Sequence, residues 1–284
     1  MKLATYMTSL GPRTGLVVKN DTAVVDVNTL GNALEIAASP ALRKRAISMT
    51  KTKPAQPIRR MKLAAPFAPR NIIAIGLNYA DHVAESGSKL PNKPVVFAKL
   101  SNTLAAPGAT ISWRADVTDK MDWEAELGVV IGKKCHRASE ADALKFVCGY
   151  VCANDLSARN LQRGDDANQW VIGKSLDGAC PIGPWLVTSD EIKDPQTLDI
   201  SCVINGQTMQ SSNTRHMIFS VARLVSHLSQ TITLMPGDLI VTGTPPGVGM
   251  GRNPQVWLKN GDVVEVVIEK IGSLKNKMRV IESA

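Results

Sequence analysis

The sequence predicts a β-rich α+β protein, and three observations support this fold class. Short apolar runs separated by Gly, Pro, Asn and Asp recur after residue 71, a pattern typical of buried strands. These runs outnumber the helical candidates, and the regular strand–helix alternation of a doubly wound sheet is missing. The chain of 284 residues, 44% of them hydrophobic, is long enough to bury a large core.

Residues 1–70 are predicted to form a small N-terminal domain. Two apolar runs around a polar turn predict a hairpin at 14–27. Alanines and leucines at near-helical spacing over 28–48 predict one or two helices. The stretch 50–69 contains four prolines and is the best candidate boundary, so residues 71–284 are assigned to a second, larger domain.

The larger domain is expected to consist mainly of buried strands. The strand candidates are apolar runs of four to six residues, at 71–76, 95–98, 127–132, 239–242 and 263–268. Helices are expected at 140–147 and 218–228. Strands followed by loops rich in Gly and Pro place the polar residues discussed below at strand ends.

The composition argues against several classes of protein. No run approaches the roughly 20 apolar residues of a membrane span, and no signal-peptide core follows Met1, so we expect a cytoplasmic protein without a membrane partner. The five cysteines form no C-x-x-C pair, which disfavours disulfides and zinc. The net charge is +8, but the cations are spread along the chain and only 4% of residues are aromatic, so no nucleic-acid partner is expected. The positive charge could instead attract small anionic substrates.

A group of acidic residues is the first candidate site. On a strand, Asp122, Glu124 and Glu126 would share one face and repel one another, and a bound dication would remove that repulsion. Spacing alone gives equal weight to a solvated strand edge. Asp155 follows the apolar run 147–153 and would either line a cleft or cap a helix. Carboxylate ligands favour Mg²⁺ or Mn²⁺ over zinc.

A second candidate is an acid–base pair. His82 and Glu85 are three residues apart, so one helical turn would place them side by side. A neighbouring carboxylate orients an imidazole and raises its basicity, although spacing alone favours an ordinary exposed pair. Lys174 lies next to Gly173 and could act as a buried cation near an anionic intermediate. The loop 242–249, rich in Gly, Pro and Thr, would either hold a carboxylate or form a structural turn.

Taken in order, these segments resemble the fumarylacetoacetate hydrolase family, in its branch of acylpyruvases and hydroxymuconate isomerases. The resemblance covers most of the chain, from about Asn71 to Met278. The segments that carry it are 76–82 with Glu85, 94–99, 124–128, 154–159 with Gln162, 173–175 with Pro181, 183–185, 203–206, 236–238, 242–245 and 258–262. So many ordered segments are specific for the family and much less specific for one reaction.

The resemblance implies a mixed β-roll catalytic domain, a small N-terminal α/β domain and a homodimer. It implies one Mg²⁺ or Mn²⁺ per subunit and assigns the three ligands to Glu124, Glu126 and Asp155. It makes His82 and Glu85 a water-activating pair on a lid helix. The remaining implied residues are catalytic Lys174 and the substrate contacts Gln162, Thr244 and Lys99.

The reaction that the resemblance implies is metal-dependent hydrolysis of a C–C bond in a β-diketo acid, an acylpyruvate or fumarylpyruvate of aromatic compound catabolism, through a metal-bound enolate. The alternative is an isomerase, tautomerase, hydratase or oxaloacetate-type decarboxylase that uses the same metal site. A basic, non-catalytic binding protein is a third hypothesis, which the acidic set disfavours. Leu77 departs from some acylpyruvate-cleaving relatives, which carry Arg there, so the substrate's chain length stays open.

Overall fold

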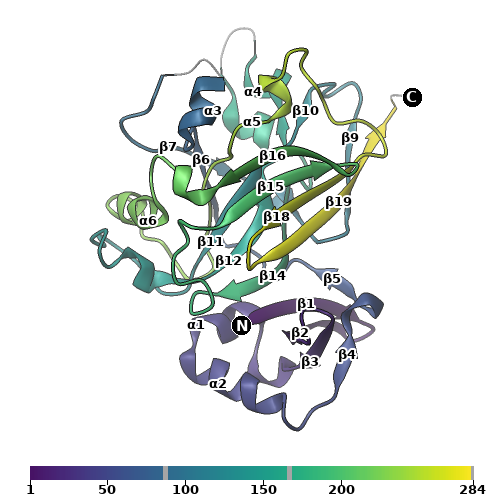
Figure 1. The fold of residues 1–284 in the computed structure, drawn as a ribbon, viewed down its shortest axis with the longest axis vertical. Helices are drawn as coiled ribbons and strands as arrows, with labels where there is room; N and C mark the ends of the chain where they lie inside the picture. The colour runs from purple at the N-terminus through teal and green to yellow at the C-terminus, as the bar shows by residue number, and fades with distance from the viewer. Residues whose placement is uncertain (86–88, 165–167, 283–284) are drawn as a thin grey trace.

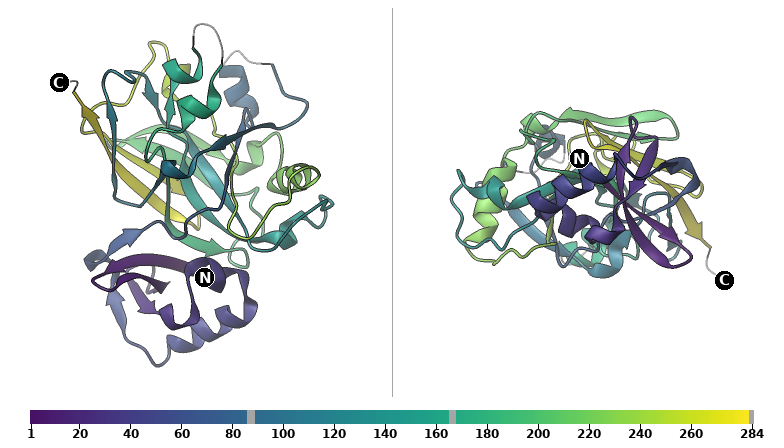
Figure 2. Two further views of the ribbon diagram at one scale, coloured as in Figure 1. Left: turned by 180° about the vertical axis from the view of Figure 1, so that it is seen from behind. Right: turned by 90° about the horizontal axis from the view of Figure 1, so that it is seen from below.

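The structure is a computed structural model that describes residues 1–85, 89–164 and 168–282. Two lobes follow one another along the longest axis, with the N-terminal elements in the lower lobe (Figure 1). The front and rear views place the N-terminus between the lobes and the end of the last strand, drawn in yellow, at a far corner of the upper lobe (Figure 2). No helix among the described residues is long and apolar enough to cross a membrane.

The lower lobe is a small curled sheet with two helices against it. Its strands are β1 (Lys2–Thr8), β2 (Gly11–Val18), β3 (Ala23–Asp26), β4 (Ala55–Pro57) and β5 (Lys62–Ala64). Its helices are η1 (Asn28–Leu30), α1 (Ala33–Ala38), α2 (Pro40–Met49) and η2 (Ile58–Arg60). The expected hairpin is therefore β2–β3, and the expected helical stretch forms α1 and α2. Asn32 caps α1 through a capping box with Glu35, and Ser39 caps α2.

The upper lobe contains the remaining strands and four short α-helices. Its strands are β6 (Ile72–Gly76), β7 (Val95–Lys99), β8 (Leu104–Ala105), β9 (Thr110–Arg114), β10 (Met121–Asp122), β11 (Ala125–Ile131), β12 (Val147–Asn154), β13 (Ser157–Ala158), β14 (Cys180–Thr188), β15 (Asp199–Ile204), β16 (Gln207–Asn213), β17 (Leu239–Val241), β18 (Val263–Ile268) and β19 (Gly272–Ile281). Its helices are α3 (Ala80–Glu85), α4 (Arg159–Gln162), α5 (Trp170–Lys174) and α6 (Val221–Ser229), with 3-10 turns η3 (Ser101–Thr103), η4 (Ala143–Phe146), η5 (Thr214–His216) and η6 (Gly249–Gly251).

Two large sheets organise these strands. The larger sheet runs in the order β4-β3-β2-β1-β14-β12-β11-β17-β6-β7, with β5 beside β1 and β8 beside β14. The smaller sheet runs in the order β16-β15-β18-β19-β9, and β10 pairs with β13 alone. Because β1 pairs with β14, the larger sheet continues from one lobe into the other. The division of the chain at residue 70 stays a prediction.

The central strand β11 is buried on both faces and separates two cores. Leu127, Val129 and Ile131 point into the core shared with the five-stranded sheet. Val130 points the other way, into the core that also contains Ile36 of α1. This alternation follows from the two-residue period of a strand. Burial on both faces explains why the sequence here is a nearly continuous apolar run.

The predicted strands are all present, whereas one predicted helix is wrong. Residues 140–147 were expected to be helical, but only the short 3-10 turn η4 forms there. The Ser139 hydroxyl accepts a hydrogen bond from the backbone N–H of Asp142, as a helix cap does, but the helical turn ends at Phe146 because β12 begins at Val147. The predicted helix at 218–228 begins later, at Val221, because Ser220 caps it.

Candidate metal and acid–base site

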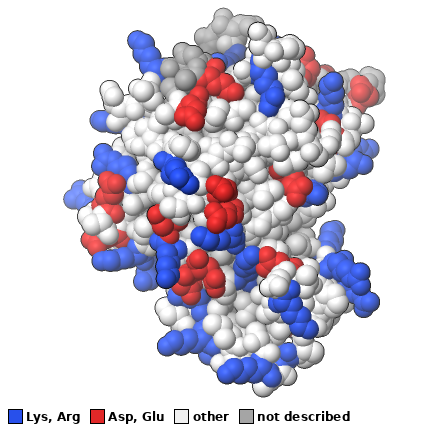
Figure 3. Space-filling model, in the orientation of Figure 1, with Lys and Arg blue, Asp and Glu red and all other residues white. Residues whose placement is uncertain are grey.

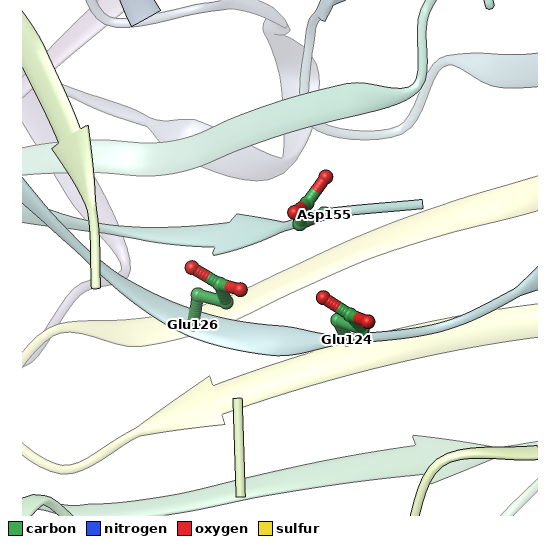
Figure 4. A group of neighbouring side chains, drawn as sticks. All are labelled: Glu124, Glu126 and Asp155. Atoms are coloured by element: carbon green, nitrogen blue, oxygen red, sulfur yellow. The ribbon is translucent and has the colours of Figure 1, made fainter. Parts of the chain in front are cut away.

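Three acidic side chains converge where β11 and β12 meet. Glu124 and Glu126 flank Ala125, which pairs across the sheet with Asn154, so Asp155 lies directly opposite Glu124. The backbone N–H of Asp155 donates to the Glu124 carbonyl oxygen at 2.9 Å. One oxygen from each of the three carboxylates lies within 4.8 Å of the others (Figure 4). All three side chains are buried.

The protonation of this group depends on its cations. Burial, with the charges of Asp155 and Glu124, raises the pKa of Glu126 well above its usual range. Burial also opposes ionisation of Glu124, but the charges of Lys174 and Arg159 outweigh it and lower its pKa to about 2. The group therefore requires positive charge in contact with its oxygens.

Lys174 supplies part of that charge. Its Nζ donates to Glu124 Oε2 at 2.7 Å and to Asp155 Oδ2 at 2.8 Å, which places the ammonium between two carboxylates. Gly173 makes this possible, because a Cβ at that position would lie 2.4 Å from the backbone nitrogen of Gln162. The absence of a side chain lets α5 pack closely on α4.

The same oxygens fit a divalent cation. They form an all-carboxylate set, the ligand chemistry that hard cations such as Mg²⁺ and Mn²⁺ prefer. The Tyr79 hydroxyl is a further buried oxygen, and no residue that the structure describes hydrogen-bonds to it. Burial first, and then the Glu126 charge, raises the pKa of Tyr79, which is consistent with a position near this carboxylate.

The two residues of the predicted acid–base pair, His82 and Glu85, are in contact on α3, and their role stays a prediction. His82 Nδ1 lies 3.0 Å from Glu85 Oε2, and His82 is buried, with 6% of the residue exposed. Glu85 Oε1 accepts a hydrogen bond from the backbone N–H of Gly247 at 2.9 Å, which ties α3 to the Gly- and Pro-rich loop. His82, Glu124 and Lys174 line one cavity of about 30 Å³. The imidazole and the carboxylate group therefore face the same small space.

Two further predicted residues line this cavity. Gln162 is buried, and its side-chain oxygen accepts from Arg159 Nη1 at 2.9 Å. The Thr244 hydroxyl donates its proton to the Ala125 carbonyl oxygen and accepts from Gln210, so only an acceptor position is left for a ligand. Both residues are placed to contact a substrate, and their contacts with one stay predictions.

Lys99 lies behind the carboxylates. Its Nζ donates to Asp155 Oδ1 at 2.6 Å and to the carbonyl oxygen of Lys174. Lys99 is not among the residues that line the cavity with His82. The geometry makes it a positioning residue for Asp155 and Lys174, and its predicted contact with substrate is untested.

Arg159 completes the site, although no sequence pattern had singled it out. Its Nε donates to Asp122 Oδ2 at 2.8 Å, and its Nη2 lies 2.7 Å from Glu124 Oε1. Asp122 Oδ1 accepts from the backbone N–H of Gly249 at 2.7 Å. Asp122 therefore does not belong to the acidic trio: β10 ends at this residue and β11 begins at Ala125, so the strand alternation that would have grouped them is broken.

Replacing Asp122 with Asn is expected to destabilise the protein by about 3 kcal/mol, because Arg159 would lose a buried charged partner. Urea unfolding measures the change. The matched control is Asp142→Asn, which removes the same charge from an exposed pair with Lys145 and should leave the unfolding midpoint unchanged. Equal midpoints for the two variants would show that the Asp122 pair contributes nothing specific.

A two-sheet β-roll that holds a buried all-carboxylate site beside a His–Glu pair defines a class of protein suited to cation-assisted acid–base chemistry. Residues 71–279 match the family model described as fumarylacetoacetate (FAA) hydrolase C-terminal. The chain belongs to the fumarylacetoacetate hydrolase family, as its sequence segments predicted.

Relatives in this family carry out more than one reaction. A mitochondrial oxaloacetate tautomerase of Bos taurus is 39% identical over 276 residues, 94% of this chain and 88% of its own. A 2,4-didehydro-3-deoxy-L-rhamnonate hydrolase of Sphingomonas sp. is 50% identical over 210 residues, 73% of this chain and 72% of its own. The chain is thus similar to both a tautomerase and a hydrolase.

Solved structures share the whole fold. A fumarylacetoacetate hydrolase from Exiguobacterium antarcticum is 35% identical, with a TM-score of 0.87 over 99% of this chain and 100% of that one. A maleylpyruvate hydrolase from Sphingobium sp., in complex with manganese(II) and pyruvate, is 28% identical, with a TM-score of 0.83 over 99% of each chain. The mixed β-roll is confirmed, and a manganese complex in a relative agrees with a divalent cation at an acidic site.

Proposed function

We propose that this chain is a Mg²⁺- or Mn²⁺-dependent hydrolase that cleaves a C–C bond in a β-diketo acid of the acylpyruvate or fumarylpyruvate type. The observation that carries the proposal is the shared cavity, in which His82, held by Glu85, faces the same small space as Glu124 and Lys174. A base and a cation-binding group on one cavity suit a reaction that makes and breaks a carbanion. One metal ion per subunit and a homodimer are part of the proposal.

Glu124, Glu126 and Asp155 would hold the cation. Bound there, it would supply Lewis-acid polarisation of a keto oxygen. Lys174 has an ammonium group beside the same carboxylates and would place positive charge near the oxygen that becomes negative during the reaction. The resident cations of the site also favour an anionic substrate.

His82 would act as the general base. Glu85 would accept a hydrogen bond from Nδ1–H of the neutral imidazole, which leaves the lone pair of Nε2 free to take a proton from water. The hydroxide oxygen forms a bond to the distal carbonyl carbon, and the bond from that carbon to the neighbouring methylene carbon breaks. The electron pair of the broken bond passes to an enolate, which takes a proton from solvent to give pyruvate, while the acyl group leaves as a carboxylic acid and His82 releases its proton to solvent.

Tautomerisation or decarboxylation of oxaloacetate is the second candidate. It is favoured by the similarity to oxaloacetate tautomerases over 94% of this chain. The same residues would serve it, because His82 would move a proton between carbon and oxygen and no water would attack. The two functions differ in whether a carbon skeleton is cut.

Product analysis separates the two functions. With Mn²⁺, acetylpyruvate is expected to lose its ultraviolet enol band and to give acetate and pyruvate by NMR, and a chelator should stop the reaction. Oxaloacetate is the comparison substrate. Rapid keto–enol interconversion or release of bicarbonate from oxaloacetate, with acetylpyruvate left intact, would reject the hydrolase in favour of the second candidate.

A further inference from the structure

The net charge of the chain is divided unevenly between its two parts. Residues 1–70 contain 12 Lys and Arg and only 3 Asp and Glu, a net charge of +9. Residues 71–284 contain 21 Lys and Arg and 22 Asp and Glu, a net charge of −1. The cations are spread along the chain, as the sequence analysis noted, but the acidic residues are not. The whole positive excess therefore belongs to the N-terminal part.

Most of these cations are exposed and uncompensated. In the lower lobe, Lys2 pairs with Asp21 and Arg13 with Asp26, while Arg43 lies near Asp190. The exposed cations that pair with no acidic residue among those the structure describes are Lys19, Lys44, Arg45, Lys51, Arg59, Arg60, Lys62 and Arg70. In the space-filling view, Lys and Arg surround the lower end of this lobe, and Asp and Glu lie near the boundary between the lobes (Figure 3).

Helix α2 places apolar surface among these charges. Lys44, Ile47 and Lys51 recur at intervals of three and four residues, so they follow one stripe along α2 and the turn after it. Ile47 is 52% exposed. Leu10, in the turn between β1 and β2, is 90% exposed. One apolar side chain between two cations gives α2 only a narrow apolar stripe, so attraction to an anionic surface would come mainly from the charges.

We propose that the lower lobe docks on an anionic lipid surface through the outer face of α2. Lipid fits better than nucleic acid for two reasons. The only aromatic residues of the first seventy, Tyr6 and Phe67, are buried, so no ring is available to stack on a base. The exposed apolar side chain of Ile47 could enter the acyl chains of a lipid layer, whereas a phosphate backbone offers it no apolar surface. This contact is peripheral, since α2 has ten residues and is too short to span a bilayer.

The docked orientation leaves the candidate site accessible. Helices α3, α4 and α5 lie at the end of the molecule opposite α2 (Figure 1). A membrane against α2 would therefore face away from the cavity. The expectation of no membrane partner stays untested, and this proposal is an alternative to it; no helix among the described residues is long and apolar enough to cross a membrane. The proposal does not depend on the reaction that the site catalyses.

Flotation of the full chain with vesicles tests the proposal. Binding is expected to phosphatidylcholine vesicles that contain about one-third phosphatidylglycerol, but not to pure phosphatidylcholine, and high salt should abolish it because screening shortens the range of the charges. The double variant Lys44→Gln, Lys51→Gln should lower the partition coefficient roughly 30-fold. Ile47→Ser should lower it roughly fivefold, because an apolar side chain no longer enters the lipid.

The matched control changes two exposed lysines of the upper lobe that lie away from α2, Lys259→Gln with Lys277→Gln. It removes the same charge and should leave the partition coefficient unchanged. An equal loss in this control would overturn docking through α2, and so would an unchanged partition coefficient in Ile47→Ser.

The absence of binding to anionic vesicles at low salt would overturn the proposal as a whole. Binding to duplex DNA that is tighter than binding to vesicles would replace lipid with nucleic acid as the partner. Circular dichroism of each variant separates loss of binding from loss of fold.

Discussion

Replacing Asp155 with Asn is expected to lower the affinity for Mn²⁺ by more than about 100-fold. The loss of a residue that only hydrogen-bonds to a metal ligand lowers metal affinity by about 10- to 100-fold, and the loss of a ligand itself should lower it more. Asp155 contributes one of three carboxylates whose oxygens lie within 4.8 Å of one another. An amide keeps the size of the side chain but loses its negative charge, which is the main attraction for a hard cation. Isothermal titration of chelator-treated protein with Mn²⁺ measures the change.

A control near the site separates ligation from a general loss of charge. Asp177→Asn removes one negative charge three residues after Lys174, from an exposed side chain, and should leave Mn²⁺ affinity unchanged. Mn²⁺ should also raise the melting temperature of the wild type and of Asp177→Asn but not of Asp155→Asn, because only a bound ion stabilises the fold. Mn²⁺ binding that is equal in all three proteins would place the metal elsewhere.

The acidic site could be predicted only in part from local sequence. The alternation of Glu124 and Glu126 is visible in the sequence, and their shared surroundings follow from the strand that begins between them. Asp155 joins them through the register of β11 against β12, which no local pattern contains. Spacing alone therefore left a solvated strand edge equally acceptable, and the family segments supplied the remaining information.

Arg159 shows why a residue that contacts the carboxylate group from outside was missed. It contacts Asp122 across 37 residues of sequence, and an arginine near a strand end usually faces solvent. Two observations pointed to it: its place in the segment 154–159 and the unexplained Asp122. An acidic residue that is buried but lies outside the metal group needs a cation of its own.

The fold shows the same limit. Apolar runs located β6, β7, β11, β17 and β18, because burial of a strand leaves a local signal. The partners of those strands were not predictable, since pairing such as that of β1 with β14 joins segments more than 170 residues apart. The continuous sheet between the lobes is a consequence of that long-range pairing.

Replacing His82 with Ala is expected to lower kcat for C–C cleavage by about 100- to 10,000-fold, the usual contribution of a general base. Mn²⁺ affinity should stay within about threefold of the wild type, because His82 is not one of the carboxylate ligands. The change is expected to lower metal affinity far less than the loss of a residue that hydrogen-bonds to a ligand. Steady-state kinetics on acetylpyruvate and titration with Mn²⁺ give the two numbers. Loss of metal binding together with activity would make His82 part of the metal site and contradict its role as a base.

Glu85→Gln tests the orientation of the imidazole without removing it. The glutamine oxygen can still accept from the Gly247 N–H, so the contact between α3 and the loop is kept. Its amide can only donate toward His82 Nδ1, which moves the ring proton to Nε2 and leaves no free nitrogen facing the cavity. The rate of C–C cleavage should therefore fall while the melting temperature stays the same.

Deuterium exchange tests whether His82 does more than activate water. If water activation is its only role, metal-dependent deuterium exchange at the methyl group of pyruvate should survive in His82→Ala and in Glu85→Gln, because that exchange needs the enolate and no water attack. Loss of exchange along with cleavage would instead show that His82 also protonates carbon, the role that the tautomerase reaction requires.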